Sequence, residues 1–249
     1  MDSFLKSITA EACKRKPELT GSRSGKHPPV NVLEVIRREF FFIAEIKHRS
    51  PSVGTVREDF DHRALAGAYS SAGASAISVI TEEDHFGGAP RFLKEVREVT
   101  DLPLLRKDFI VTMEQVRESY ILGADIVLLI AACLTIDMLR SLQAAVLDLG
   151  MTPLVEIHTE GELDMVLKTD PVLLGVNNRN LNDFRVSLET SLKLAELIPR
   201  GIPRISESGI SSREHIAIVR EAGFHGVLVG ESLLRQQDPG KALRSLRNG

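Results

Sequence analysis

Acidic and basic residues that could exchange protons stand at the ends of short apolar runs in this sequence. Glu45 and Lys47 are two residues apart where the run 41–46 ends, so a strand there would place both side chains on one face. An acid and a base at the end of a buried strand are costly to desolvate unless they pair or contact a ligand. The pair therefore indicates either a structural ion pair or a site for acid–base chemistry.

Further polar residues follow later apolar runs in the same way. Lys107 could donate a proton as a general acid or form a Schiff base with a carbonyl substrate. Glu156 has apolar neighbours, so it is a candidate base with a perturbed pKa. His158 directly precedes a predicted helix, and we interpret it as a capping or surface histidine. Asn177 and Arg179 form another pair with a spacing of two.

Two glycine-containing turns near the end of the sequence indicate an anion site. Backbone N–H groups at such turns can bind a phosphate, and glycine lets the ligand approach the backbone closely. The balancing positive charge could come from Arg179 or Lys47. The residues that form the two turns are Ser208, Gly209, Gly230 and Glu231.

Two phenylalanines accompany the polar residues. Phe86 follows the second apolar run and Phe109 comes two residues after Lys107. Their rings would suit an aromatic substrate, although they could instead cap the apolar core. We also expect Phe109 to limit the access of water to Lys107, so that burial lowers the pKa of this lysine.

The candidate residues belong to a regular alternation of strand-like and helix-like segments. Eight strands alternating with eight helices over roughly 200 residues predict an α/β protein with a single (β/α)8 TIM barrel. A doubly wound sheet is less consistent, because no GxGxxG follows the first run. Active sites of such barrels lie at the carboxyl ends of the strands, where the candidate residues stand. The strands are expected at 41–46, 76–80, 102–105, 126–130, 153–157, 172–176, 202–206 and 226–229. The helices are expected at 63–72, 91–99, 113–122, 136–149, 160–167, 188–197, 212–222 and 239–246.

The first forty residues differ from the rest and are predicted to form a helical extension, with the barrel at 41–249. Apolar residues on one side of 3–15 indicate a helix, and Asn31 could cap a second helix at 32–38. The segment 20–29 has the composition of a mobile loop. The basic residues of this region are expected to form a solvated face, or an arm over an anionic ligand; they are Lys14, Arg15, Lys16, Arg23 and Lys26.

Composition excludes several classes of protein. The chain is 43% hydrophobic and 26% charged, as in ordinary globular proteins, and its net charge of -3 argues against a nucleic-acid binder. The longest apolar run, 126–134, is too short to span a membrane, and the start does not resemble a secretory signal. Two cysteines, Cys13 and Cys133, cannot form a disulfide framework, which is consistent with a cytoplasmic protein. No Cys/His cluster has metal-ligand spacing, so we expect neither a metal nor an organic cofactor.

Six motifs in order along the chain, from about Ile43 to Leu234, resemble those of the indole-3-glycerol phosphate synthase family. That family closes the indole ring in tryptophan biosynthesis and belongs to the carboxy-lyases. The motifs are Ile43-Ala44-Glu45-Ile46-Lys47-x-x-Ser50-Pro51-Ser52, Ser78-Val79-Ile80-Thr81-Glu82, Leu105-Arg106-Lys107-Asp108-Phe109, Leu154-Val155-Glu156-Ile157-His158, Val176-Asn177-Asn178-Arg179-Asn180-Leu181 and Ser206-Glu207-Ser208-Gly209-Ile210.

The resemblance implies a substrate and roles for the catalytic residues. The substrate would be 1-(2-carboxyphenylamino)-1-deoxyribulose 5-phosphate, which loses carbon dioxide and water as its ring closes. Lys107 would be the general acid that polarises the substrate carbonyl. Glu156 would act in the later dehydration as base or as stabiliser of a cationic intermediate, and Asn177 would orient the substrate. Glu45 and Lys47 would form a catalytic ion pair.

The resemblance also implies a set of binding residues. Lys47 would reach the substrate carboxylate or phosphate. The family often carries another lysine or alanine after this residue, where this chain has His48-Arg49, and we expect these two residues to be exposed. The implied partner is a phosphorylated small molecule, and the protein would be a monomer that a pathway enzyme could contact. Substrate contacts are expected from Ser50, Phe86, Phe109, Arg179, Glu207 and Ser208, and phosphate contacts from Lys47, Ser208, Gly209, Gly230 and Glu231.

Two other functions are compatible with a barrel of this kind. The first is a Schiff-base aldolase that uses Lys47 or Lys107 and retains the phosphate site. The second is a barrel without catalytic activity that binds a metabolite or a partner. The second is disfavoured because a binding protein has no need of paired acidic and basic groups at the mouth of the barrel.

Overall fold

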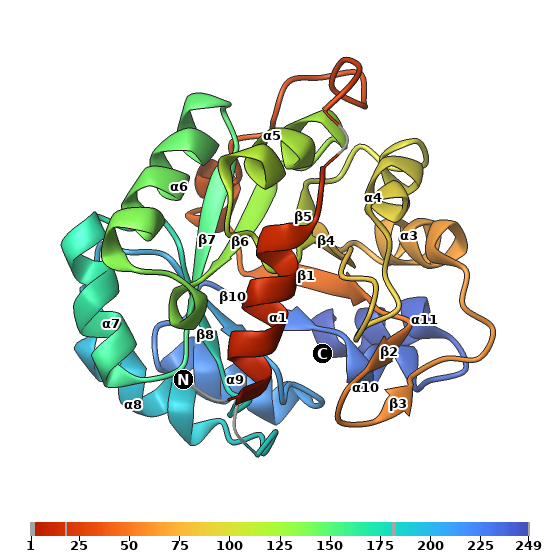
Figure 1. Cartoon of the computed structure of the whole chain (residues 1–249). Coiled ribbons are helices and arrows are strands. Elements are labelled where there is room, and N and C mark those ends of the chain that lie inside the picture. The colour runs from red at the N-terminus through yellow and green to blue at the C-terminus, as the bar shows by residue number, and fades with distance from the viewer. Residues whose placement is uncertain (1–2, 18, 181–182, 249) are drawn as a thin grey trace.

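The structure, a computed structural model, describes residues 3–17, 19–180 and 183–248; Leu181, the last residue of one quoted motif, lies outside them. Eight parallel strands close into a barrel in the order β1-β10-β9-β8-β7-β6-β5-β4, with helices around it (Figure 1). The predicted (β/α)8 barrel is therefore confirmed. The strands are β1 Phe41–Ile46, β4 Ala76–Ile80, β5 Leu104–Lys107, β6 Ile126–Ile130, β7 Thr152–Ile157, β8 Leu174–Asn177, β9 Arg204–Glu207 and β10 Gly226–Val229.

Three strands begin about two residues later than predicted and end on a polar residue. Lys107, Asn177 and Glu207 are the last residues of β5, β8 and β9. Lys107 pairs in register with Ile80 of β4, and Glu207 pairs with Asn177. The backbone pairing between strands continues through these polar residues, because their side chains point into the cavity at the barrel mouth. A search for apolar runs in the sequence therefore ends the predicted strands too early. The predicted strand boundaries were wrong at these positions.

The eight predicted helices are present, and several begin at side-chain caps. Asp61, Thr112, Thr135, Thr159 and Ser212 each accept a hydrogen bond from a backbone N–H of the following first turn. In the described part of the chain, no helix is long and apolar enough to cross a membrane. The helices are α3 His62–Ser71, α4 Pro90–Arg97, α5 Met113–Ile121, α6 Ile136–Asp148, α7 Glu160–Val166, α8 Glu189–Leu197, α9 Arg213–Glu221 and α11 Pro239–Arg247.

A few short elements were not predicted. The strands β2 (Arg49–Ser50) and β3 (Gly54–Thr55) form a small antiparallel hairpin after β1. The helix α10 (Glu231–Leu234) follows β10, and two 3-10 segments occupy Ala131–Cys133 and Leu167–Thr169. These pieces are too short to produce a periodic pattern.

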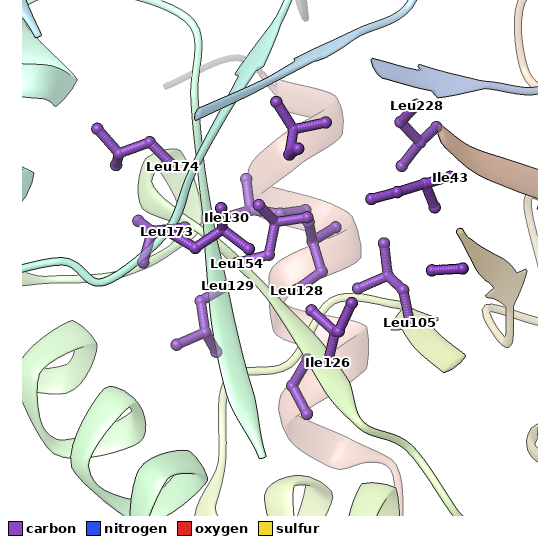
Figure 2. Packing of buried hydrophobic residues seen from close by; sticks show 14 of the residues in the cluster. Ile43, Leu105, Ile126, Leu128, Leu129, Ile130, Leu154, Leu173, Leu174 and Leu228 are labelled. Atoms are coloured by element: carbon purple, nitrogen blue, oxygen red, sulfur yellow. The ribbon is translucent and has the colours of Figure 1, made fainter. Parts of the chain in front are cut away.

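The core fills both the interior of the barrel and the layer between strands and helices. Figure 2 shows part of it, with Ile43, Leu105, Leu128, Leu154 and Leu228 contributed by five different strands. Each of these side chains is at most 4% exposed. Such close packing holds the strand ends, and the polar residues on them, in defined positions.

The N-terminal region packs against the barrel. Figure 1 shows α1 (Ser3–Lys14) crossing the open end of the barrel, and Leu5, Ile8 and Ala12 of this helix are buried in the core. The helix α2 (Val32–Ile36) is shorter than predicted, but Asn31 caps it as expected, with its side chain accepting the N–H of Leu33. The domain boundary at residues 40 and 41 stays a prediction.

Two basic residues of this region are not part of a solvated face, so that prediction was wrong for them. Arg23 donates to Asp125 over 2.8 Å, and its side chain is 9% exposed. Arg15 donates to the buried Asp108 over 2.7 Å. Arg23 thus anchors the loop 20–29 to the barrel at a buried carboxylate, which Arg97 also contacts over 2.9 Å.

Candidate active site

A cavity of about 650 Å³ opens at the carboxyl ends of the barrel strands. Its volume is within the range of small-molecule sites, and Ile80, Leu128 and Leu228 contribute apolar wall. Every predicted site residue lines it, so the structure brings together the whole set; the roles of these residues stay predictions. They are Glu45, Lys47, Ser50, Phe86, Lys107, Phe109, Glu156, Asn177, Arg179, Glu207, Ser208, Gly209, Gly230 and Glu231.

Lys107 of β5 contacts two carboxyl groups from other strands, Glu156 of β7 and Glu207 of β9. Its Nζ lies 3.3 Å from Glu156 Oε2 and 3.5 Å from Glu207 Oε2. Burial by itself would lower the pKa of Lys107, but Glu156, Glu207 and Glu45 together raise it well above its usual value. The expectation of a lowered pKa was therefore wrong, because it considered the burial of Lys107 without the acids that other strands bring to it.

Glu156 and Glu207 share Lys107 but differ in their protonation. Burial would raise the pKa of Glu156, but the charges of Lys107 and His158 outweigh this and hold it well below its usual range. Burial raises the pKa of Glu207 to about 8, and the neighbouring Glu156 adds to the effect, while Lys107 opposes it. Near neutral pH the pair therefore has one ionised and one protonated carboxyl, as expected when two acids share a site.

Gly175 makes room for the Glu207 carboxyl. A Cβ at position 175 would lie 2.1 Å from Glu207 Oε1, so any larger residue there would force the carboxyl to move. Gly175 pairs in register with Glu156, so it lies beside both acids. Sequence reasoning missed this residue; its only signal is a glycine inside a predicted strand, which often marks a close approach.

Glu45 and Lys47 form the ion pair that their spacing predicted. Lys47 Nζ donates to Glu45 Oε1 over 2.8 Å, and both residues are buried. Burial would raise the pKa of Glu45, but Lys47 and Lys107 outweigh it and lower the pKa. Gly230 lies against this acid, since a Cβ there would be 2.4 Å from Glu45 Oε1. The pair therefore borders the glycine turn after β10.

The turns Ser208-Gly209 and Gly230-Glu231 line the part of the cavity that the guanidinium group of Arg179 reaches. Ser208 and Gly209 have φ angles of 66° and 80°, which turns the backbone sharply after β9. Arg179 Nη2 lies 3.6 Å from Glu231 Oε2, and Arg235 Nε lies 3.0 Å from Glu231 Oε1. Both arginines line the cavity. This wall therefore combines tight turns with two guanidinium groups.

Aromatic rings cover another part of the mouth. The centroids of Phe86 and Phe109 are 6.5 Å apart, and both rings line the cavity. The Glu82 carboxylate accepts the backbone N–H groups of His85 and Phe86 over 2.9 Å each, which fixes the turn that carries Phe86. Phe4 of α1 also lines the cavity, although it was not among the predicted site residues.

Two histidine interpretations need correction. His158 is not a surface residue: its side chain is 6% exposed, and its ring lies between the carboxylates of Glu156 and Glu162. The burial of the ring was not predicted, because the position of His158 just before α7 is also typical of a capping residue. Its backbone N–H does donate to the Glu162 carboxylate in the first turn of that helix. His48 is half-buried and stacks on Phe60 with 4.9 Å between centroids, whereas Arg49 is exposed as expected.

The architecture and the mouth together define a class of protein. A (β/α)8 barrel whose cavity places two lysines against the carboxyl groups of Glu45, Glu156 and Glu207 is an acid–base enzyme of the barrel type. Among the described residues, no group of three or more His, Cys, Asp or Glu side chains is arranged to hold a metal ion.

The chain belongs to the indole-3-glycerol phosphate synthase family, whose model matches residues 9–246. It is 48% identical over 205 residues to the indole-3-glycerol phosphate synthase of Carboxydothermus hydrogenoformans, covering 82% of this chain and 78% of that protein. It is 43% identical over 242 residues to the same enzyme of Salinibacter ruber, covering 94% and 90%. Among solved structures, KGPDC from Streptococcus mutans matches with a TM-score of 0.66 and 12% identity over 84% of this chain and 96% of that chain, a likeness of fold alone.

Proposed function

We propose that this chain converts 1-(2-carboxyphenylamino)-1-deoxyribulose 5-phosphate into indole-3-glycerol phosphate. The membership in the family supports the reaction, and the position of Lys107 between Glu156 and Glu207 supports its acid–base chemistry. The ring carbon that bears the carboxylate attacks the substrate carbonyl, carbon dioxide leaves, and the loss of water completes the indole ring. Ring closure and the loss of water each move a proton at the mouth of the barrel, where the lysine and the acidic residues lie.

Lys107 is proposed to protonate the carbonyl oxygen as the ring closes. Its ammonium group keeps its proton at neutral pH because of the acids around it, so Lys107 is in the protonated form that a general acid requires. The developing alkoxide is a strong base and can take this proton. Glu207, 3.5 Å away and protonated near neutral pH, can then return a proton to the amine.

Glu156 is proposed to serve the dehydration. As an ionised carboxylate in a low-dielectric cavity, it can stabilise a cationic intermediate and accept the proton that restores the aromatic ring. Asn177, in register with Glu207, is proposed to orient the substrate from the neighbouring strand end. Glu45 would hold Lys47 in position to contact the substrate carboxylate or phosphate.

The phosphate is proposed to bind between the turns Ser208-Gly209 and Gly230-Glu231. Backbone N–H groups and the arginine at 179 would supply the contacts. Phe86 and Phe109 would hold the anthranilate ring, with Ser50 at the rim beside it. We expect a cofactor-free enzyme of the cytoplasm; a monomeric state and contact with a pathway enzyme are also predictions.

A fluorescence assay with the synthetic substrate tests the proposed function. We expect indole-3-glycerol phosphate to form with the purified chain alone. Borohydride trapping with a phosphosugar, followed by mass spectrometry, tests the Schiff-base alternative. Because Schiff-base formation needs a neutral amine and Lys107 is held charged, we expect no trapped adduct. A trapped adduct at Lys47 or Lys107 without indole product would contradict the proposal.

Replacing Gly209 by valine tests the phosphate site. A Cβ at this position would lie 2.7 Å from Val186 Cγ1, and the φ of 80° is strained for any residue with a side chain. Such strain costs roughly 1–2 kcal/mol, so we expect the KM to rise about tenfold with little change in kcat. Steady-state kinetics, with inorganic phosphate as competitor, measure this.

The control for this variant is Gly161→Ala in α7, where an added Cβ contacts nothing within 4 Å. It should leave KM unchanged. If a substrate without its phosphate binds as tightly as the natural one, the phosphate site is not where we place it.

Replacing Arg15 by alanine tests whether α1 contributes to substrate binding. Arg15 pairs with Asp108, and the same helix places Phe4 and Leu5 in the cavity wall. Because Arg15 is partly exposed, its ion pair with Asp108 should contribute no more than about 1 kcal/mol to holding α1 in place. We therefore expect KM to rise roughly two- to fivefold. This variant is a more specific test than deleting the residues before about Asn31, because that deletion would also remove Arg23 from Asp125.

Limited proteolysis of α1 and steady-state kinetics measure the effect of Arg15→Ala. The matched control is Lys14→Ala, because Lys14 is the exposed neighbour of Arg15. An α1 that is cleaved more readily while KM stays unchanged would show that the helix does not serve the site.

A further inference from the structure

His158 lies behind Glu156, outside the cavity wall. Its Nε2 is 3.3 Å from Glu156 Oε1, and its Nδ1 is 3.2 Å from Glu162 Oε2. Neither His158 nor Glu162 is among the described residues that line the cavity. The imidazole can therefore influence a substrate only through Glu156.

The Glu162 carboxylate is held in place from the backbone. Its Oε2 accepts the N–H of His158 over 2.7 Å, and its own N–H donates to the hydroxyl of Thr159, which caps α7. A negative charge is favoured in the first turn of a helix. Glu162 is thus a fixed anion on the outer side of the imidazole.

An imidazole between two carboxylates is most stable with both nitrogens protonated. In either neutral tautomer, one ring nitrogen would direct a lone pair at a carboxylate oxygen, whereas the imidazolium has two N–H donors. Nε2 of the imidazolium lies 3.3 Å from Glu156 Oε1, close enough for its positive charge to stabilise an ionised carboxylate. The ring therefore delivers a positive charge to Glu156.

The same charge does not reach Glu207 to the same extent. Lys107 contacts the two acids at similar distances, 3.3 and 3.5 Å, and so does not decide between them. Of these two acids, His158 forms an ion pair with Glu156 alone among the described residues. Glu207 Oε1 is buried and has no aligned hydrogen-bond donor among the described residues. The surroundings thus favour an ionised Glu156 and a protonated Glu207.

We propose that His158, backed by Glu162, is a positioning residue that holds Glu156 as the ionised member of the Glu156–Glu207 pair. The proposal rests on the proposed function, since it sets the resting protonation of that acid–base site. It extends the function by assigning a task to two residues that do not touch the substrate.

The direction of each pKa agrees with this arrangement. Burial would lower the pKa of His158, but Glu156 and Glu162 outweigh it and raise the pKa to about 9. The titratable groups around the ring are Glu156 on β7 and Glu162 on α7, with Lys107 on β5 and Glu207 on β9 one contact further away. Cys133 also lies near both carboxylates, and burial raises its pKa to about 11, so it stays a neutral thiol.

The kinetic test is the pH profile of His158→Gln, which removes the charge and keeps a polar side chain. Loss of a charge at this distance raises the pKa of a carboxyl by about one unit or more. If activity requires ionised Glu156, the acid limb of kcat moves to higher pH by about one unit. At a pH on that limb kcat then falls about tenfold, and it recovers at higher pH, while KM changes less than twofold.

The matched control is His225→Gln, because His225 is a half-buried histidine before β10, at the other end of the barrel. Its profile should equal that of the unaltered protein. A His158→Gln profile that is lowered equally at all pH values, or not at all, would overturn the proposal, since a purely structural role does not shift the limb.

A measurement without substrate separates this proposal from the proposed function. Carboxyl carbon NMR of protein labelled at glutamate, assigned with Glu156→Gln and Glu207→Gln, reports which acid is ionised near neutral pH. We expect Glu156 ionised in the unaltered chain and a higher titration midpoint for it in His158→Gln. An unchanged midpoint overturns the inference even if the chain is active, and a shift supports it even if the assay finds no product.

If His158→Gln does not fold, Glu162→Gln provides the same test from the outer side. Without that carboxylate, the imidazolium loses one of its two partners. The NMR titration midpoint of His158 should then move down by about one unit. An unchanged midpoint would overturn the proposed role of Glu162 and with it the imidazolium that the proposal requires.

Discussion

Replacing Lys107 by alanine is expected to lower kcat by about 10²–10⁴-fold, with a much smaller change in KM. The ammonium group is the proposed proton donor to the substrate carbonyl, and it lies 3.3 Å from Glu156 and 3.5 Å from Glu207. Without it, the two buried acids would lose their shared cation and take up protons. Steady-state kinetics over a range of pH, together with thermal unfolding, measure the effect on turnover and on the fold.

Lys107→Arg tests whether the reaction needs only the positive charge at this position or also a proton that can be transferred. Arginine keeps the positive charge between the acids but does not release a proton at neutral pH, so the fold should be preserved while kcat stays low. Lys94→Ala, at an exposed position of α4, is the matched control and should have normal kinetics. Near-normal turnover of Lys107→Ala, with activity abolished in Lys47→Ala at saturating substrate, would reverse the assigned roles.

Replacing Lys47 by alanine should raise KM substantially and also lower kcat. A charged hydrogen bond to a substrate anion contributes roughly 1.5–3 kcal/mol, which corresponds to a loss of about ten- to a hundredfold in kcat/KM. Glu45→Gln should resemble it, because Lys47 Nζ donates to Glu45 Oε1 over 2.8 Å and each residue positions the other. Kinetics of the two single variants and of the double variant test this.

The double variant decides whether Glu45 and Lys47 act as a unit. If they do, losing both should cost little more than losing one, since the pair is broken in each case. Fully additive losses would show that the two residues contribute independently. A change in kcat alone for Lys47→Ala, without a rise in KM, would show that this lysine does not bind the substrate anion.

The sequence by itself determined the architecture and the members of the cavity. Alternating apolar runs and amphipathic segments specify strands and helices locally, and the caps at Asp61, Thr112 and Ser212 mark where helices begin. Because parallel strands of a barrel all end at the same rim, polar residues after the apolar runs had to meet there. For this reason Glu45, Lys107 and the other predicted residues all line one cavity.

The protonation of the site was decided only by the tertiary structure. Lys107 is 49 residues from Glu156 and 100 residues from Glu207 in the chain, yet it contacts both. A pKa depends on distances to charges and on burial, and neither is visible in local sequence. The raised pKa of Lys107 and the buried position of His158 between Glu156 and Glu162 were therefore missed.

The same reason applies to the N-terminal region. Its apolar periodicity was sufficient to predict α1, because a helix is specified by neighbours three and four residues apart. The partners of Arg15 and Arg23 were not predictable, because Asp108, directly after β5, and Asp125, directly before β6, lie 93 and 102 residues later in the chain. Local spacing thus determines which elements form and which residues they carry to the rim, whereas long-range packing determines which charges face one another.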